Sequence, residues 1–241
     1  MSEVYVQNKQ IVIPGELLGT GMDLLPSGST FREDENIYSS KVGIVTLEGR
    51  LVKVIPLAGR YVPKKGDTIV GIVNNILMSG WRVDLDGPYE AVLSVRDATE
   101  QYIAKGDDLK RIINIGDVIF AKVSNVTTQM LIDLTLKGPG YKKLYGGRII
   151  RVTSSKVPRI IGKKGSMIKI IKDATSCKIV VGQNGRVWLS GEPEMEILAI
   201  RTINKIEEEA HTSGLTERIK EFLEAETKTK ITLNEETENQ R

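Results

Sequence analysis

The 241-residue sequence contains a single cysteine and no long apolar run, and both absences narrow the classes of protein to consider. One cysteine, Cys177, cannot form an internal disulfide and is typical of a reducing, intracellular compartment. No apolar stretch approaches the roughly 18 residues that a membrane-spanning helix requires. The N-terminal residues MSEVYVQNKQ lack the charged and apolar regions of a signal peptide. We therefore expect a soluble, cytoplasmic protein.

Residue types that carry catalysis or bind metals are also scarce. The only histidine, His211, follows the acidic run 207–209, and no cysteine–histidine cluster has the spacing of metal ligands. The sequence has no phosphate-binding or dinucleotide-binding glycine motif. Asp84 and Asp86 flank the turn Asp86-Gly87-Pro88 and are interpreted as turn residues, although a metal-dependent nuclease would use such carboxylates. We expect no catalytic residue, no metal and no cofactor.

Positive charge is concentrated in one part of the sequence. Residues 146–191 contain ten lysines and arginines but one acidic residue, Asp173, so their net charge is +9. The whole chain carries only +3, because residues 192–241 contain seven basic and thirteen acidic residues. A surplus of this kind, interleaved with apolar core residues, predicts a polyanionic partner.

The apolar pattern predicts a multidomain protein that is mainly β, with an α+β C-terminal part. We expect a small N-terminal β-module at 1–63, a barrel at 64–144, an α+β domain at 145–213 and a charged, partly disordered tail at 214–241. Five strand-like runs follow one another in the second segment, namely TIVGIVN, WRVDLD, EAVLSV, DVIFAKVSNV and LIDLTL. Five strands with a polar interruption after the third match a five-stranded OB-type barrel.

The third segment shows the order strand, helix, helix, strand, strand, helix. Strands are predicted at GGRIIRV, CKIVV and RVWLSG, with a short helix at VPRIIG, a longer one at 166–175 and a third that begins at Pro193. The apolar stripe expected on the third helix consists of Ile197, Ile200, Ile203 and Ile206. This βααββα order is that of a type I KH domain.

Two glycines three positions apart, Gly162 and Gly165, separate the first two helices in VPRIIGKKGSMIKII. Glycine lets the backbone approach a phosphate closely, and the next helix presents unpaired amide groups to an anion. A KH domain uses such a G-x-x-G loop to hold about four nucleotides of single-stranded RNA. A plain helical hairpin has the same loop, but the strand order and the charge favour the KH domain.

The bases should then lie over an apolar groove formed by Ile160, Ile161, Ile168 and Ile179. The RNA-binding residues predicted in this domain are Arg159, Ile160, Ile161, Gly162, Lys163, Lys164, Gly165, Ser166 and Lys169.

The barrel segment resembles an S1 RNA-binding domain in its Gly-Asp strand openings and its GWRVDLDG run. Such domains bind single strands through aromatic residues on the face of strands 2 and 3. Arg82 occupies the usual aromatic position here, and Trp81 is expected to point to the opposite face, into the core. An arginine can still stack on a base or pair with a phosphate. The weaker contacts predicted on this barrel are Arg82, Lys105, Arg111 and Lys122.

The succession of β-module, S1 barrel and KH domain resembles the family of RNA-binding cap subunits of the archaeal exosome. The segments that carry the resemblance are IVIPGELLG, YVPKKGDTIVGIV, WRVDLDGPYEAVLSV and GGRIIRVTSSKVPRIIGKKGSMIKII. It implies a non-catalytic subunit that docks through its N-terminal module on a hexameric ring of RNase PH-like subunits. Three copies would form a trimeric cap that passes RNA to the phosphorolytic 3′-to-5′ ring, with A-rich RNA as one expected substrate.

Two other hypotheses stay open from the sequence. One is a metal-dependent nuclease in its own right. The other is a stand-alone translation or transcription factor built from S1 and KH modules. Bacterial elongation factors of that type carry two KH units and lack the IVIPGELLG module, which favours the exosome hypothesis.

Overall fold

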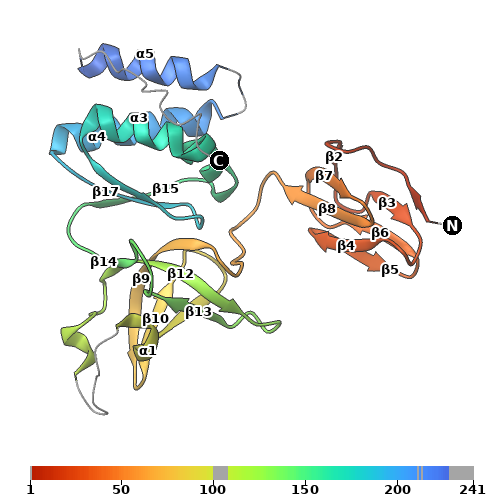
Figure 1. Ribbon diagram of the computed structural model, residues 1–241, viewed down its shortest axis with the longest axis horizontal. Helices are drawn as coiled ribbons and strands as arrows, with labels where there is room; N and C mark the ends of the chain where they lie inside the picture. Colours follow the sequence, from red (N-terminus) through yellow and green to blue (C-terminus); the bar gives the residue numbers. More distant parts are fainter. Residues whose placement is uncertain (1, 100–107, 211, 213, 228–241) are drawn as a thin grey trace, which may run out of the picture. The chain divides into compact units, whose positions relative to one another are not determined.

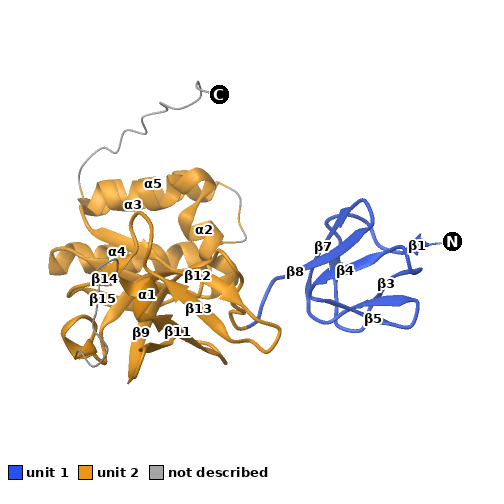
Figure 2. Ribbon diagram, turned by 60° about the horizontal axis from the view of Figure 1, so that its bottom comes forward, with its two compact units in different colours: residues 1–59 blue, residues 60–241 orange. Residues whose placement is uncertain are grey.

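The computed structural model describes residues 2–99, 108–210, 212 and 214–227, and the chain forms two compact units (Figure 2). Unit 1 comprises residues 1–59 and unit 2 comprises residues 60–241. Unit 2 contains both the barrel and the KH domain, so these two parts belong to one compact body. Within the described residues, no helix has the length and apolarity needed to cross a lipid bilayer.

Unit 1 is an all-β module, as predicted. Its described residues form two four-stranded sheets, with the strand orders β1-β3-β6-β5 and β2-β7-β8-β4. The strands are β1 (Glu3–Val4), β2 (Ile11–Val12), β3 (Leu17–Thr20), β4 (Leu25–Gly28), β5 (Thr30–Glu33), β6 (Asn36–Ser39), β7 (Gly43–Glu48) and β8 (Leu51–Pro56). Alternate residues of these strands, such as Val12, Val45 and Val54, are fully buried and form the core.

The five-stranded barrel expected from the sequence is also confirmed. Its strands are β9 (Thr68–Leu77), β10 (Gly80–Asp84), β11 (Glu90–Ser94), β12 (Val118–Val126) and β13 (Ile132–Thr135). They follow the order β13-β11-β10-β9-β12, and pairing between β12 and β13 closes the barrel. Trp81 is completely buried in the core, and its Nε1 donates a hydrogen bond to the Ile113 carbonyl oxygen at 2.7 Å. The prediction of a core tryptophan was therefore correct.

Three short elements accompany the barrel strands, two of them between β11 and β12 and one after β13. They are α1 (Val95–Ala98), η1 (Leu109–Arg111) and β14 (Lys142–Leu144), which adds to the free edge of β12. The segment before β9 is held by the Tyr61 hydroxyl, which donates to Asp67 Oδ2 at 2.7 Å. Burial and this hydrogen bond raise the pKa of Tyr61 far above its usual range, so the phenol stays protonated as a donor.

The KH domain has the predicted βααββα order. Its elements are β15 (Arg148–Arg151), η2 (Ser154–Lys156), α2 (Val157–Ile161), η3 (Lys163–Gly165), α3 (Ser166–Thr175), β16 (Lys178–Val181), β17 (Arg186–Ser190) and α4 (Pro193–Glu208). The strands form an antiparallel sheet in the order β15-β17-β16. Figure 1 shows α3 and α4 on one face of this sheet, where their apolar side chains form a common core with β17.

The buried face of α4 differs from the stripe expected from the sequence. Ile197 is 45% exposed, whereas Leu198, Ala199 and Thr202 are buried together with Ile203. A helix advances 100° per residue at 3.6 residues per turn, so a strict three-residue spacing drifts around the helix by about 60° at each step. The predicted stripe started on the wrong side of the helix for this reason.

The segment after Gly214 is a further helix, not the tail that we predicted. Helix α5 (Leu215–Thr227) buries Leu215, Ile219 and Leu223 at four-residue spacing against the KH core. Large apolar residues are few in this segment, which is why its sequence suggests a charged tail. The expected disorder of the last residues concerns 228–241, which lie outside the described residues.

The face of the KH sheet opposite its helices packs on the barrel. Trp188 from β17, Val70 from β9 and Leu144 from β14 form a separate buried cluster. The Trp188 Nε1 donates to the Gly146 carbonyl oxygen at 2.9 Å and ties the connection after β14 to the sheet. The KH sheet thus lies between the KH helices and the barrel. This packing fixes the orientation of the loop between α2 and α3 within unit 2.

Candidate nucleic-acid interface

The loop Gly162-Lys163-Lys164-Gly165 connects α2 and α3 in a conformation that requires its glycines. Gly162 has φ 76° and ψ 175°, a region that residues with a side chain avoid. A Cβ on Gly162 would lie 2.6 Å from the Met167 amide nitrogen. Gly165 and Lys164 adopt the left-handed region, with φ 82° and 54°. The glycines therefore bring the backbone close to the start of α3 and turn both lysine side chains outwards, where they are exposed.

Helix α3 begins directly after this loop. Its N-cap residue is Gly165, and no side chain caps the first amide groups. Those amides carry the partial positive charge of the helix dipole and have no acceptor within the helix. Ser166 at the first turn and Lys169 one turn later are exposed. The arrangement can accept a phosphate on backbone amides with lysines beside it, as the sequence predicts.

The isoleucines predicted to line a groove for bases do not all face the surface. Ile160 is completely buried and Ile179 is 3% exposed, and both belong to the KH core. Their predicted role as groove-lining contacts is therefore wrong, since helix packing uses these side chains. Ile161 and Ile168 are partly exposed and pack at the edge of the core. These two residues are the apolar contacts that the structure leaves accessible beside the loop.

The ten cations counted in residues 146–191 separate into two groups. Four of them bind to other groups of the chain. Arg148, Arg151 and Arg186 form ion pairs, and Lys156 Nζ donates to the Glu207 carbonyl oxygen. The other six form no ion pair within the described part of the chain, and all are exposed; they are Arg159, Lys163, Lys164, Lys169, Lys172 and Lys178. The net charge of +9 thus overstates the charge offered to a ligand. Five of the six remaining cations lie on α2, the loop and α3.

A second glycine turn of the same spacing, Gly182-Gln183-Asn184-Gly185, lies at the contact between the KH sheet and the barrel. Asn184 is 5% exposed, and its amide accepts from the Val70 N–H at 3.2 Å and donates to the carbonyl oxygens of Val70 and Leu85, both at 2.9 Å. Gln183 exchanges two further hydrogen bonds with the backbone of Thr68. The residue types of this segment, glutamine and asparagine between two glycines, indicate a turn and carry no signal of the contact.

Arg186 completes the contact between the two parts. Its side chain is 1% exposed, and its Nη1 donates to the Asp84 carbonyl oxygen at 2.7 Å. The Nη2 pairs with the Asp84 carboxylate, and Asp86 Oδ1 lies 3.7 Å away. Arg151 pairs with Asp86 at 2.9 Å. The two carboxylates that a nuclease would use are thus bound by arginines of the KH sheet.

The ionisation of Asp84 reflects this pairing. Partial burial raises its pKa, but the hydrogen bonds and charge of Arg186, with smaller contributions from the Asp86 amide and Arg151, outweigh burial and hold the pKa below its usual value. Asp84 is therefore an ionised partner of a buried arginine at neutral pH.

The barrel residues predicted to bind RNA are not gathered at one place. Arg82 is exposed but pairs with Glu90 at 3.4 Å, and Lys122 faces Thr68 near the other end of β9. Arg82 faces Asn75, seven residues from Thr68, which is roughly 20 Å along the strand. Arg111 is exposed on η1. Lys105 lies outside the described residues, so the structure does not place it.

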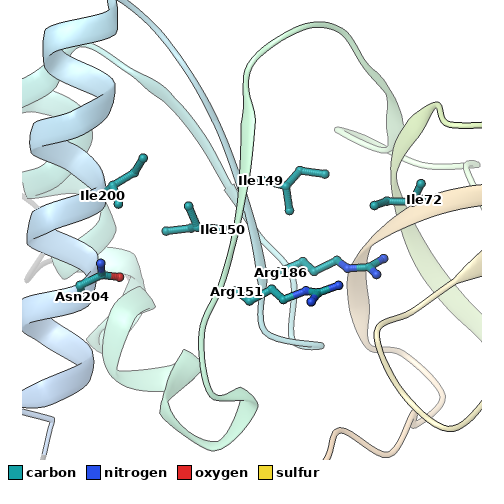
Figure 3. Close-up of a pocket in the computed structure, with 7 residues that line it drawn as sticks. All are labelled: Ile72, Ile149, Ile150, Arg151, Arg186, Ile200 and Asn204. Atoms are coloured by element: carbon teal, nitrogen blue, oxygen red, sulfur yellow. The ribbon is translucent and has the colours of Figure 1, made fainter.

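An open pocket of about 580 Å³ lies at the edge of β15, between α4 and β9 (Figure 3). Its walls are apolar on both sides, and its two arginines are those paired with Asp84 and Asp86. The residues that line it are Ile72, Ile149, Ile150, Arg151, Arg186, Ile200 and Asn204. Because its cations are neutralised, this pocket lacks the charge of a phosphate site.

Comparisons with known proteins match two parts of the sequence to family models. Residues 9–58 match the family described as Exosome RNA binding protein RRP4 N-terminal domain, and residues 147–195 match the KH domain family. A crystal structure described as an exosome complex RNA-binding protein superposes with a TM-score of 0.64 and 39% identity. It covers 70% of this chain and 98% of that one.

Two curated relatives extend the match to nearly the whole sequence. The proteins named exosome complex component Rrp4 from Pyrococcus furiosus and from Thermococcus kodakarensis are 46% and 47% identical to this chain over 227 residues. The alignments cover 92% of this chain and 86% and 88% of the two relatives. The family resemblance inferred from the sequence is confirmed: the chain belongs to the Rrp4 family of exosome complex components.

Proposed function

We propose that this chain is a non-catalytic exosome subunit that captures single-stranded RNA and passes it to a phosphorolytic 3′-to-5′ ring. The observation that carries the proposal is the loop 162–165, where exposed lysines without carboxylate partners in the described residues stand beside the uncapped N-terminus of α3. Backbone amides and mobile cations are the groups that bind RNA phosphates in a KH domain.

The strength of one such site is modest. With four phosphates and a slope of about −0.7 per phosphate for a single strand, raising salt from 50 to 200 mM weakens binding roughly fifty-fold. Useful affinity under cellular salt therefore favours several linked sites. Three copies on one ring would supply them, which is consistent with a trimeric cap.

Unit 1 offers an apolar surface suited to docking on the ring of RNase PH-like subunits. Ile11, Ile44 and Ile55 form one cross-strand row on the outer face of β2, β7 and β8. Ile11 and Ile55 are 62% and 48% exposed, and Val42 and Leu57 extend the row with similar exposure. A row of this size on one sheet face is typical of an interface with another protein.

The ion pairs of Asp84 and Asp86 support a non-catalytic role. Both carboxylates pair with arginines of the KH sheet, so a metal ion would have to displace those pairs. A preference for A-rich RNA stays a prediction of the family resemblance, and a cytoplasmic location stays a prediction from the composition of the sequence.

The RNA site is tested by the double variant K163D/K164D in the full chain. We expect weaker binding of a labelled single-stranded RNA and a flatter salt dependence, with an unchanged melting temperature because both lysines are exposed. Unchanged affinity and slope would show that the loop is not the main RNA site.

The assembly is tested by the native mass of the complex and by Ile55→Lys. The proposal predicts a nine-subunit particle of three cap chains and six ring subunits, and a charged residue in the apolar row should prevent association without altering RNA binding by the isolated chain. Cleavage of RNA by the isolated chain with Mg²⁺ and phosphate, abolished in D84N, would instead favour the nuclease hypothesis.

A further inference from the structure

The connection between the barrel and the KH domain has an unusual composition. Residues 137–148 read KGPGYKKLYGGR and contain four cations, two tyrosines and no acidic residue. The charge surplus noted for 146–191 therefore starts earlier in the chain. We call Lys142, Lys143 and Tyr145 the β14 strip, since they lie on or directly after β14.

Tyr145 is the most accessible aromatic side chain in the described residues that belong to the barrel and KH domain, at 75% exposure. The Lys143 Nζ lies 5.3 Å from the centroid of its ring. The backbone directly after Tyr145 is fixed, because the Gly146 carbonyl oxygen accepts from Trp188 Nε1 at 2.9 Å. The ring thus protrudes from an anchored segment with a cation beside it.

The register of β14 explains this exposure. Lys143 pairs with Ile119 and Leu144 with Val118 on β12, and successive strand residues point to opposite faces. Leu144 is buried against Trp188, so Lys143 and Tyr145 point away from that cluster. Tyr141 packs against Phe120 in a tilted arrangement, with 5.5 Å between ring centroids, and is only partly exposed. Tyr145 is therefore the more accessible of the two tyrosines in this connection.

Single-stranded nucleic acid binds to exposed aromatic rings, since every base has a face that stacks on such a ring. Arg82, at the usual aromatic position of the barrel, is paired with Glu90. Lys143 is paired with Asp117, and Lys142, which is exposed, lies by strand alternation on the face of Leu144, opposite to Tyr145. The strip therefore offers a ligand the ring of Tyr145 and no unpaired cation beside it among the described residues.

We propose that the exposed ring of Tyr145 in the β14 strip is a second contact for single-stranded RNA, on which a base stacks. The inference rests on the proposed RNA-binding function and adds a site outside both the KH loop and the strand face of the barrel. It also divides the work between stacking at the strip and phosphate binding at the loop.

The test is fluorescence anisotropy of the full chain with a fluorescein-labelled 12-nucleotide RNA of mixed sequence. Tyr145→Ala should weaken binding at least about five-fold, because stacking of one base on an aromatic ring contributes roughly 1–3 kcal/mol. The salt slope should stay unchanged, since no cation is lost. Tyr145→Phe keeps the ring and should recover most of the lost affinity, whereas Lys142→Gln, on the opposite face of β14, should leave the affinity unaltered.

A matched control is Tyr5→Ala, which removes a 54% exposed tyrosine of unit 1 and should leave affinity unaltered. Both tyrosines are exposed, so neither change should affect folding. If Tyr145→Ala binds within two-fold of the wild type while K163D/K164D is impaired, the strip is not an RNA site and the proposed function still holds. If the wild-type chain does not bind RNA, both proposals are wrong.

Discussion

Two turns of the KH domain share the spacing G-x-x-G and have opposite roles. The turn at 162–165 carries two lysines, is exposed and opens onto the start of α3. The turn at 182–185 carries glutamine and asparagine and bonds to the backbone of β9. The same glycine spacing thus forms an exposed cationic loop in one place and a packing contact with the barrel in the other.

The difference lies in the two residues between the glycines. An asparagine amide can satisfy a backbone donor and acceptors at once, which a buried interface requires, while a lysine must keep its charge in water. Arg186 shows the same difference between a buried and an exposed polar group. It is a cation of the same basic segment, yet it is buried because Asp84 pairs with it. Charge counted along the sequence therefore predicts a polyanion partner only where no carboxylate of the fold neutralises it.

The largest effect is expected from Asn184→Lys, which gives the buried turn the residue type of the exposed one. It places an ammonium group in a buried site and removes the partners of two carbonyl oxygens and one amide, a loss of about 4 kcal/mol in the free energy of unfolding. Urea unfolding followed by tryptophan fluorescence measures it. Asn184→Ala, which adds no charge, should lose about half as much; equal stability of wild type and both variants would contradict the role of this turn.

Arg186→Met is expected to lower the free energy of unfolding by about 3 kcal/mol. The change leaves Asp84 unpaired at the contact, and breaking a buried ion pair costs this order of energy. The matched control is Lys178→Met, because Lys178 is exposed and unpaired in the described residues. A similar stability of the two variants would show that Arg186 does not hold the KH sheet on the barrel.

The reverse exchange, Lys163→Gln with Lys164→Asn, makes the exposed turn identical to the buried one. Folding should be unaffected, since asparagine tolerates the positive φ of position 164. Removing two cations should lower the salt slope of RNA binding by about 1.4, at about 0.7 for each. Binding titrations at four salt concentrations measure the slope, and an unchanged value would mean that neither lysine contacts a phosphate.

The smallest expected effect is a change with pH in the contribution of Asp84 to the free energy of unfolding. The pKa of Asp84 is lowered in the folded chain, so its pairing stabilises the fold above the unfolded value of about 3.9 and loses this contribution as pH falls through the folded pKa. The stability difference between wild type and Asp84→Asn should be constant from pH 5 to 8 and shrink below about pH 4. Urea midpoints at each pH provide the measurement. A difference that stays constant down to pH 3 would show that Asp84 is not the titrating partner.

The succession of β-module, barrel and KH domain, the strands of the barrel and the position of the glycine loop could all be predicted from the sequence. These features depend on local rules, namely the period of apolar residues and the conformations open to glycine, and such rules act over a few neighbouring residues. The burial of Trp81 followed from strand alternation in the same way.

Which residues a ligand can reach depends on how the folded chain packs. Ile160 and Ile179 were predicted to line a groove for bases, but their side chains are buried in the core between the helices and the sheet. Arg186 pairs with Asp84, which is 102 positions away in the sequence, and Asn184 forms a hydrogen bond with Val70, which is 114 positions away. Pairings over such separations arise only when the chain folds back on itself, so the sequence shows the charges and the fold determines which remain for RNA.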